Sequence, residues 1–104
     1  MDWARKDLLD IESLSPTEIQ TLLDCARYFK KVCLSPRKYA PFLQGYTVAN
    51  FFVEPSTRTR TSFELAAKHL GATVVNLSAE SSSLKKGETL KDTVLNLEAL
   101  QTDV

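Results

Sequence analysis

Hydrophobic residues in the first third of the chain repeat with the period of an α-helix. The pattern predicts a helix from Pro16 to about Val32, with an apolar face formed by Ile19, Leu22, Leu23, Ala26 and Phe29. Ser15 and Glu18 form a capping box in front of this helix, and proline occupies its first position. Apolar residues before the cap are expected to pack against the helix; they are Leu8, Leu9, Ile11 and Leu14.

A nearly continuous apolar run follows further along the chain. Thr47 to Val53 predicts a strand buried on both faces of a parallel sheet, with Gly45 opening it and Pro55 ending it. Apolar residues then return with helical spacing, so a second helix should begin within Ser56–Thr59 and end at Gly71. Its apolar face comprises Phe63, Ala66, Ala67 and Leu70.

β-branched residues dominate the next segment, Ala72 to Leu77, which predicts a second strand parallel to the first. Strand, helix and strand then form one right-handed crossover unit. A polar, serine-rich loop runs from Ser78 to Gly87, and Thr89 with Asp92 forms a second capping box. The third helix carries on its apolar face Leu90, Val94, Leu97 and Leu100 or Gln101.

These elements describe an α/β fold, in the order helix, strand, helix, strand, loop, helix. Two parallel strands cannot cover their own edges, so a doubly wound sheet made of these strands alone is incomplete. Thr102–Val104 stands where a third strand would begin. We therefore expect the 104 residues to be the front part of a larger protein.

Hydrogen-bond donors gather where the second helix begins. A helix that starts directly after a buried strand leaves backbone N–H groups unpaired, and its dipole makes that end partly positive. Ser56, Thr57 and Thr59 add hydroxyls, and Arg58 adds a planar guanidinium, although basic residues oppose the dipole in a first turn. We interpret the cluster as an anion site that suits phosphate. The alternative is an ordinary N-capped helix with a solvated basic turn.

Two other residues of this helix are expected to be structural. Arg60 precedes Glu64 by about one helical turn, so an ion pair between them explains both. His69 lies near the helix end, where a solvated cation suits the dipole.

The segment Phe51–Glu64, FFVEPSTRTRTSFE, closely resembles the carbamoyl-phosphate signature of the aspartate and ornithine carbamoyltransferases. A second block, Lys86–Thr93, resembles the Lys-Gly-Glu-Thr loop of the aspartate enzymes rather than its ornithine counterpart. The resemblance extends from near Ser15 to Val104. It implies that residues 1–104 are the N-terminal part of a doubly wound, parallel-sheet carbamoyl-phosphate-binding domain, and that the aspartate-binding domain is absent from this chain.

The resemblance also implies a reaction. The carbamoyl group of carbamoyl phosphate is transferred to the amino group of L-aspartate, giving N-carbamoyl-L-aspartate and phosphate in de novo pyrimidine biosynthesis. No metal or organic cofactor is expected. Carbamoyl phosphate would be bound through its phosphate by Ser56, Thr57, Arg58 and Thr59, and Arg58 would also act catalytically near the leaving oxygen.

The serine-rich loop is implied to serve a neighbouring subunit of a homotrimer. Lys86 would cross the subunit boundary, act catalytically and bind the aspartate carboxylate. Ser83 would accompany it on carbamoyl phosphate, with Ser82 as the alternative loop serine. Two other functions stay open: an ornithine carbamoyltransferase, or a truncated non-catalytic paralogue that binds phosphate or associates with a complete partner.

Composition narrows the partners and the compartment. The 13 basic and 13 acidic residues leave no net charge, which argues against nucleic acid or an anionic membrane as the main partner. No apolar stretch is long enough for a bilayer and the start lacks a signal-peptide core, so we expect a cytoplasmic protein. Cys25 and Cys33 lack metal-ligand spacing and are expected to be free thiols, with no metal site.

Overall fold

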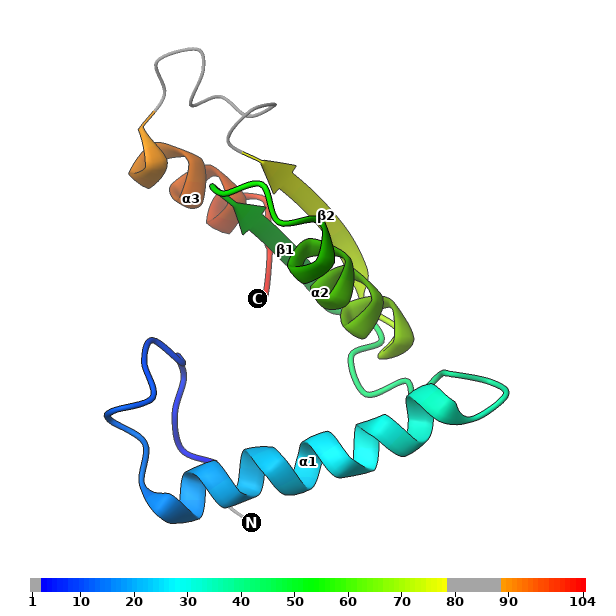
Figure 1. Cartoon of the computed structure of the whole chain (residues 1–104). Helices are drawn as coiled ribbons and strands as arrows, with labels where there is room; N and C mark the ends of the chain where they lie inside the picture. The colour runs from blue at the N-terminus through cyan, green and yellow to red at the C-terminus, as the bar shows by residue number, and fades with distance from the viewer. Residues whose placement is uncertain (1–2, 79–88) are drawn as a thin grey trace. The chain divides into compact units, whose positions relative to one another are not determined.

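A computed structural model describes residues 3–78 and 89–104 of the chain. Its elements are α1 (Pro16–Leu34), β1 (Thr47–Phe52), α2 (Thr57–His69), β2 (Thr73–Ser78) and α3 (Leu90–Ala99), shown in Figure 1. This order confirms the predicted α/β succession of elements. The chain divides into two compact units, Met1–Lys38 and Tyr39–Val104, which are described separately below.

The first unit is organised by the capping box at the start of α1. The Ser15 hydroxyl accepts a hydrogen bond from the Glu18 amide at 3.1 Å, and the Glu18 carboxylate accepts one from the Ser15 amide at 2.9 Å. Both halves of the predicted box are therefore present, with Pro16 at the first helical position. The helix runs two residues beyond the predicted end, to Leu34, where the Ser35 amide and hydroxyl both bond to the Val32 carbonyl.

An ion pair, rather than apolar packing, ties the preceding segment to α1. Arg5 donates to both carboxylate oxygens of Glu18, at 2.6 Å from Nε and 3.0 Å from Nη2, and also bonds to Ser13. The predicted packing of the apolar residues before the cap is wrong for three of them, since Leu8, Leu9 and Ile11 are between 58% and 88% exposed.

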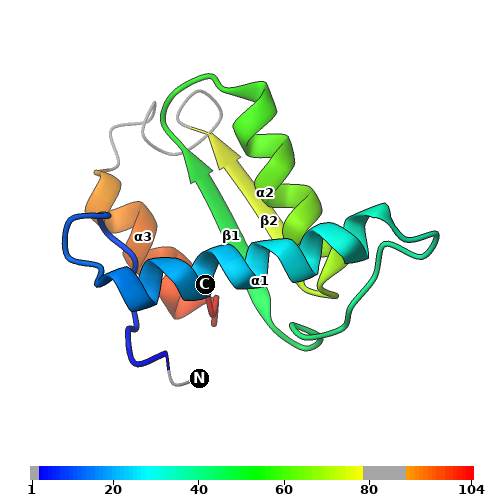
Figure 2. The same cartoon turned by 60° about the horizontal axis from the view of Figure 1, so that its bottom comes forward.

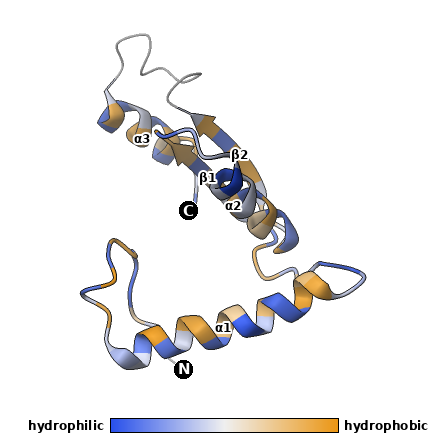
Figure 3. Ribbon diagram, in the orientation of Figure 1, coloured by the Kyte–Doolittle hydropathy of each residue, from blue (hydrophilic) through white to orange (hydrophobic). Residues whose placement is uncertain are grey.

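The helix α1 is amphipathic, as its sequence pattern predicts. Apolar and polar residues occupy different sides of it in Figure 3, and none of its residues is buried. Among the described helices, none combines the length and the apolar content needed to cross a bilayer.

In the second unit, β1 and β2 form a parallel sheet, with Thr47 opposite Thr73 and Phe52 opposite Ser78. The parallel pairing was predicted. Successive side chains of a strand point to opposite faces. Of those on β1, Val48 and Asn50 are buried, whereas the other residues of the strand are only half-buried. The expectation of burial on both faces is thus met on one face only.

The two later helices lie on opposite sides of the sheet (Figure 2). The helix α2 packs against both strands, and α3 faces β1 across a cavity lined by Ala49, Phe51, Val94 and Leu97. Figure 2 shows the strands between α2 and α3. This arrangement, with helices on both faces of a parallel sheet, is the doubly wound form that was expected.

Gly71 ends α2, as predicted, by a Schellman motif. Its φ is +84°, its amide bonds to the Lys68 carbonyl at 3.0 Å, and the Ala72 amide bonds to the Ala67 carbonyl at 3.1 Å. Gly45 does not open β1, contrary to expectation. It lies in a turn with a φ of +90°, and β1 begins at Thr47.

The helix α3 starts as predicted and ends earlier. The Thr89 hydroxyl accepts the Asp92 amide at 3.1 Å, which is the N-cap half of the predicted box. The helix ends at Ala99, and Gln101 turns the chain with a φ of +68°.

The last described residues lie along the edge of β1 opposite β2. The Ala49 amide bonds to the Val104 carbonyl at 2.7 Å, and the Val104 amide bonds to the Thr47 carbonyl at 3.2 Å. Val104 therefore sits between Thr47 and Ala49 as a partner in a parallel ladder does. The Tyr46 carbonyl, one residue earlier, faces the other way and accepts the Thr73 amide. These bonds place strand-like pairing where the sequence predicts a third strand to begin.

The environment of the Glu18 carboxylate predicts that the first unit loses stability in acid. Arg5, and then the Ser15 amide, lower the pKa of Glu18 from 4.5 to about 2. A depressed folded-state pKa stabilises the folded form above the unfolded value, and this contribution is lost as pH falls from about 4.5 to about 2. We expect the wild type to unfold at a higher temperature than Glu18→Gln at neutral pH and to lose that advantage across this window.

The measurement is the thermal unfolding midpoint by circular dichroism at a series of pH values. The exposed Glu12 provides a matched control, and Glu12→Gln should follow the wild type throughout. A difference between the wild type and Glu18→Gln that does not change with pH would contradict the prediction.

Candidate functional site

The helix α2 begins beside the carboxyl end of β1 (Figure 1). Ser56 occupies the N-cap position with φ −140° and ψ 86°, and its hydroxyl makes no capping hydrogen bond. The Arg60 amide is the first one in α2 that donates a hydrogen bond within the helix, to the Ser56 carbonyl at 3.0 Å. The amides of Thr57, Arg58 and Thr59 therefore lack helical acceptors, and no acidic residue stands in the first turn.

The predicted donors are gathered at this helix start. Ser56 is half-buried, whereas Thr57, Arg58 and Thr59 are exposed. None of their side chains is engaged by another described residue. The ordinary-cap alternative requires the Ser56 hydroxyl to accept a helix amide, and the structure does not show that bond. The helix start thus offers amides, hydroxyls and a guanidinium as donors. An external oxyanion is the kind of acceptor that suits such a set.

The predicted ion pair between Arg60 and Glu64 is wrong. Glu64 bonds instead to Lys68 at 2.6 Å, four residues later on α2. A glutamate that precedes its lysine by four residues is the favoured orientation in a helix, which explains why Glu64 pairs forward. Lys68, and to a smaller extent the Asn76 amide, lower the pKa of the Glu64 carboxyl.

Arg60 and Glu64 instead line a cavity of about 280 Å³ between α2 and the carboxyl ends of the strands. The sheet contributes to this cavity a polar pair, since Asn50 Nδ2 donates to Asn76 Oδ1 at 3.2 Å. The remaining lining residues are Phe52, Leu77 and Ser78. The two asparagines are not among the site residues predicted from the sequence. A signal for them exists, because each interrupts an otherwise apolar strand pattern at the same register position.

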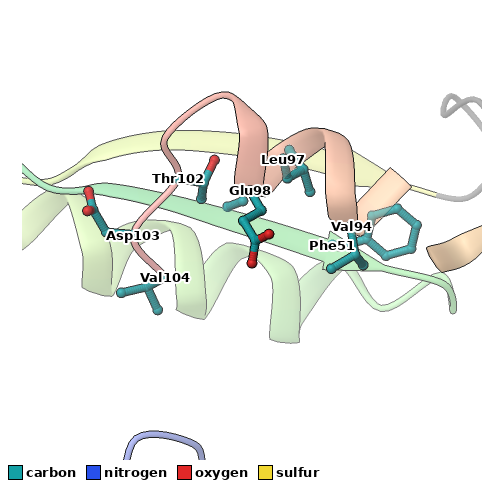
Figure 4. Close-up of a pocket in the computed structure, with 8 residues that line it drawn as sticks. Phe51, Val94, Leu97, Glu98, Thr102, Asp103 and Val104 are labelled. Atoms are coloured by element: carbon teal, nitrogen blue, oxygen red, sulfur yellow. The ribbon is translucent and has the colours of Figure 1, made fainter. Parts of the chain in front are cut away.

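A second cavity, of about 290 Å³, lies on the α3 side of β1 (Figure 4). Phe51, Val94 and Leu97 give it a mainly apolar lining, and Glu98 and Asp103 are the charged residues among the described ones that line it. Since both charges are negative, this cavity does not suit a phosphate.

The described residues include three others that were considered from the sequence. His69 is half-buried in the last turn of α2, at the opposite end of that helix. Cys25 and Cys33 lie on α1 without a disulfide. Within residues 3–78 and 89–104, no three metal-ligating side chains form a group that could hold a metal ion. Lys86, Ser83 and the alternative Ser82 lie outside the described residues.

Comparison with known proteins decides the family. The model of the carbamoyl-phosphate-binding domain of aspartate/ornithine carbamoyltransferases matches residues 6–104. This chain belongs to that family. The aspartate carbamoyltransferase catalytic subunit of Syntrophus aciditrophicus is 55% identical over 104 residues, which are 100% of this chain and 34% of that protein. The catalytic subunit from Thermus thermophilus is 54% identical over 98 residues, covering 94% of this chain and 32% of the relative.

Solved structures of the family share this fold. The catalytic subunit of M. jannaschii aspartate transcarbamoylase superposes with a TM-score of 0.80 at 38% identity, over 92% of this chain and 31% of that one. Aspartate transcarbamoylase from Trypanosoma cruzi, in complex with carbamoyl aspartate and phosphate, superposes with a TM-score of 0.78 at 35% identity, over 90% and 30% of the two chains. The chain thus spans about a third of the length of the carbamoyltransferases that it matches.

Because Glu64 pairs with Lys68 and not with Arg60, the two cations should differ in their effect on the pKa of Glu64. Lys68→Gln removes the main cause of the depressed pKa, so the pKa of Glu64 should rise toward 4.5. Arg60→Gln, the matched control, should change it little. An NMR titration of the Glu64 carboxyl carbon in the complete protein measures both. A larger shift in Arg60→Gln would restore the pairing predicted from the sequence.

Proposed function

We propose that this chain is the carbamoyl-phosphate-binding part of an aspartate carbamoyltransferase. The reaction is transfer of the carbamoyl group from carbamoyl phosphate to the amino group of L-aspartate, in de novo pyrimidine biosynthesis. The observation that carries the proposal is the start of α2, where uncapped amides meet the Ser56–Thr59 side chains of the family signature. The T. cruzi relative, solved with carbamoyl aspartate and phosphate, is named with the two products of this reaction.

In this proposal, Ser56, Thr57, Arg58 and Thr59 hold the phosphate of the donor through amides and side chains. Attack by the aspartate amine builds negative charge on the carbonyl oxygen, and the departing phosphate then carries more charge than before. Donors that are already in place stabilise this charge without reorganising. Arg58 is the catalytic cation, because a guanidinium can hold two oxygens of the leaving group in one plane. We expect no metal or organic cofactor, since these groups supply the positive potential.

The position of the site in the fold supports the same ligand. In doubly wound sheets, ligands bind outside the carboxyl ends of the strands, where successive connections go to opposite sides. β2 lies on one edge of β1, and Asp103 and Val104 pair with the other edge, so β1 is the central strand at such a point. The start of α2 follows directly from the carboxyl end of this central strand.

Aspartate is favoured over ornithine as the acceptor. The Lys86–Thr89 block resembles the aspartate enzymes, and the relatives reported above are aspartate carbamoyltransferases. We further propose that Lys86 acts catalytically and binds the aspartate carboxylate in a neighbouring subunit's site, with Ser83 contacting carbamoyl phosphate beside it. This sharing requires an oligomer, and a cytoplasmic homotrimer is proposed. A truncated, non-catalytic phosphate-binding paralogue is the remaining alternative.

The complete protein that carries this sequence should carbamoylate L-aspartate and not L-ornithine. Arg58→Ala should lower the rate on the order of a hundredfold or more, because a donor to the transition state is lost, and should leave the fold intact. Arg58→Lys, which keeps the charge but not the fork, should fall between the wild type and Arg58→Ala. Product formation with each amino acid and a circular dichroism spectrum of each variant provide the measurements.

Arg37→Ala provides the matched control, since Arg37 is an exposed arginine in the loop after α1. It should keep the wild-type rate. Near-normal turnover by Arg58→Ala would overturn the assigned role, and carbamoylation of ornithine in preference to aspartate would overturn the substrate.

Shared sites predict complementation between two inactive proteins. Arg58→Ala and Lys86→Ala disable different subunits' contributions to one site, so a mixed oligomer contains some sites with both groups intact. Separately inactive variants should therefore regain part of the activity after dissociation and re-association together. Each variant treated alone is the control. A mixture that stays as inactive as its components would contradict donation between subunits.

A further inference from the structure

Asn50 is a polar residue in the buried face of the sheet. It is 8% exposed, comparable to the apolar Val48 two positions earlier on the same face of β1. Burying an amide costs free energy unless it is hydrogen-bonded, and an apolar residue of similar size at this position avoids that cost. The bond from Asn50 Nδ2 to Asn76 Oδ1 satisfies the amide across the strand pair. Packing of the sheet therefore does not by itself explain why asparagine occupies this buried position.

The asparagines face the part of α2 that contains Glu64. Asn50 and Asn76 line the same 280 Å³ cavity as Glu64 and Arg60. Lys68 holds the Glu64 carboxylate at 2.6 Å from the helix side of this cavity. A series of polar side chains around one cavity thus runs from the interior of β1 through β2 to the second turn of α2.

We propose that Asn50, through Asn76 and Glu64, is a positioning residue for the anion-binding start of α2. This inference rests on the proposed function, since it concerns how that site is held. Val48 on β1 and Ala67 on α2 are buried apolar residues, and the burial of apolar surface is non-directional. Polar groups interact directionally, so the polar side chains that α2 and the sheet present to this cavity favour one rotation of the helix about its axis.

The rotation matters because Glu64 lies about two turns, or about 10 Å, along α2 from Thr57. A rigid helix transmits its rotation over that length, which sets the direction of the free amides of the first turn and of the Arg58 side chain. Small misplacements of binding groups can cost up to about a hundredfold in rate. The polar series therefore acts on the phosphate site without touching the ligand.

The test compares Asn50→Leu with Val48→Ala in the complete protein. Leucine suits a strand and leaves the Asn76 oxygen to bind water, because Asn76 is exposed, so the unfolding midpoint should stay the same or rise. The Kd for inorganic phosphate and the KM for carbamoyl phosphate should each rise about tenfold, with the KM for L-aspartate unchanged. Val48→Ala should lower the unfolding midpoint and leave phosphate affinity unchanged.

Glu64→Leu is a second variant, at the half-buried helix end of the series. Removing a negative charge near the site would strengthen phosphate binding if Glu64 acted only through its charge. A positioning role predicts weaker binding, so the two explanations differ in sign. Calorimetric titration with inorganic phosphate measures each variant without requiring turnover.

Unchanged phosphate affinity in Asn50→Leu, or an equal loss in Val48→Ala, would overturn the inference. Tighter phosphate binding in Glu64→Leu would do the same. A wild type that binds phosphate without carbamoylating aspartate would contradict the proposed function alone, and the affinity comparison would still decide the inference. A wild type that does not bind phosphate would contradict both.

Discussion

The unpaired amides at the start of α2 are the constraint on which the rest of this unit depends. A helix that follows a parallel strand presents its first N–H groups at the carboxyl edge of the sheet, where neither the ladder nor the helix supplies acceptors. The usual remedy is a side-chain cap, and Ser56 does not provide one. The amides of Thr57, Arg58 and Thr59 are instead left without acceptors in the helix, in the same turn that carries two hydroxyls and a guanidinium.

The strand β1 positions that helix start from both of its edges. One edge pairs with β2, and the other already bonds to Asp103 and Val104. The Asp103 carboxylate also accepts the Thr47 amide at 2.9 Å, so the first residue of the strand is held on the same edge. Because β1 is hydrogen-bonded along both edges, its carboxyl end is held in place. The turn after Phe52, which leads into α2, therefore starts from a fixed position.

The two arginines of the first turns of α2 have different surroundings. Arg58 stands beside the free amides, where its positive charge is unfavourable to the helix dipole unless an anion is present. Arg60, one turn from the uncapped Ser56, faces a polar cavity shared with Glu64 and the two asparagines. Because Lys68 already neutralises Glu64, the net charge around this helix start stays positive, as a phosphate site requires.

The sequence by itself determined the elements and the chemistry of the helix start. Periodicity, the Ser15–Glu18 box and Gly71 are local signals, since each depends on residues within one or two turns. Only the tertiary structure decided which groups pair over longer distances. Arg5 reaches Glu18, Asn50 meets Asn76, and Val104 joins the edge of β1. Such choices depend on where separate segments meet, which no local pattern records.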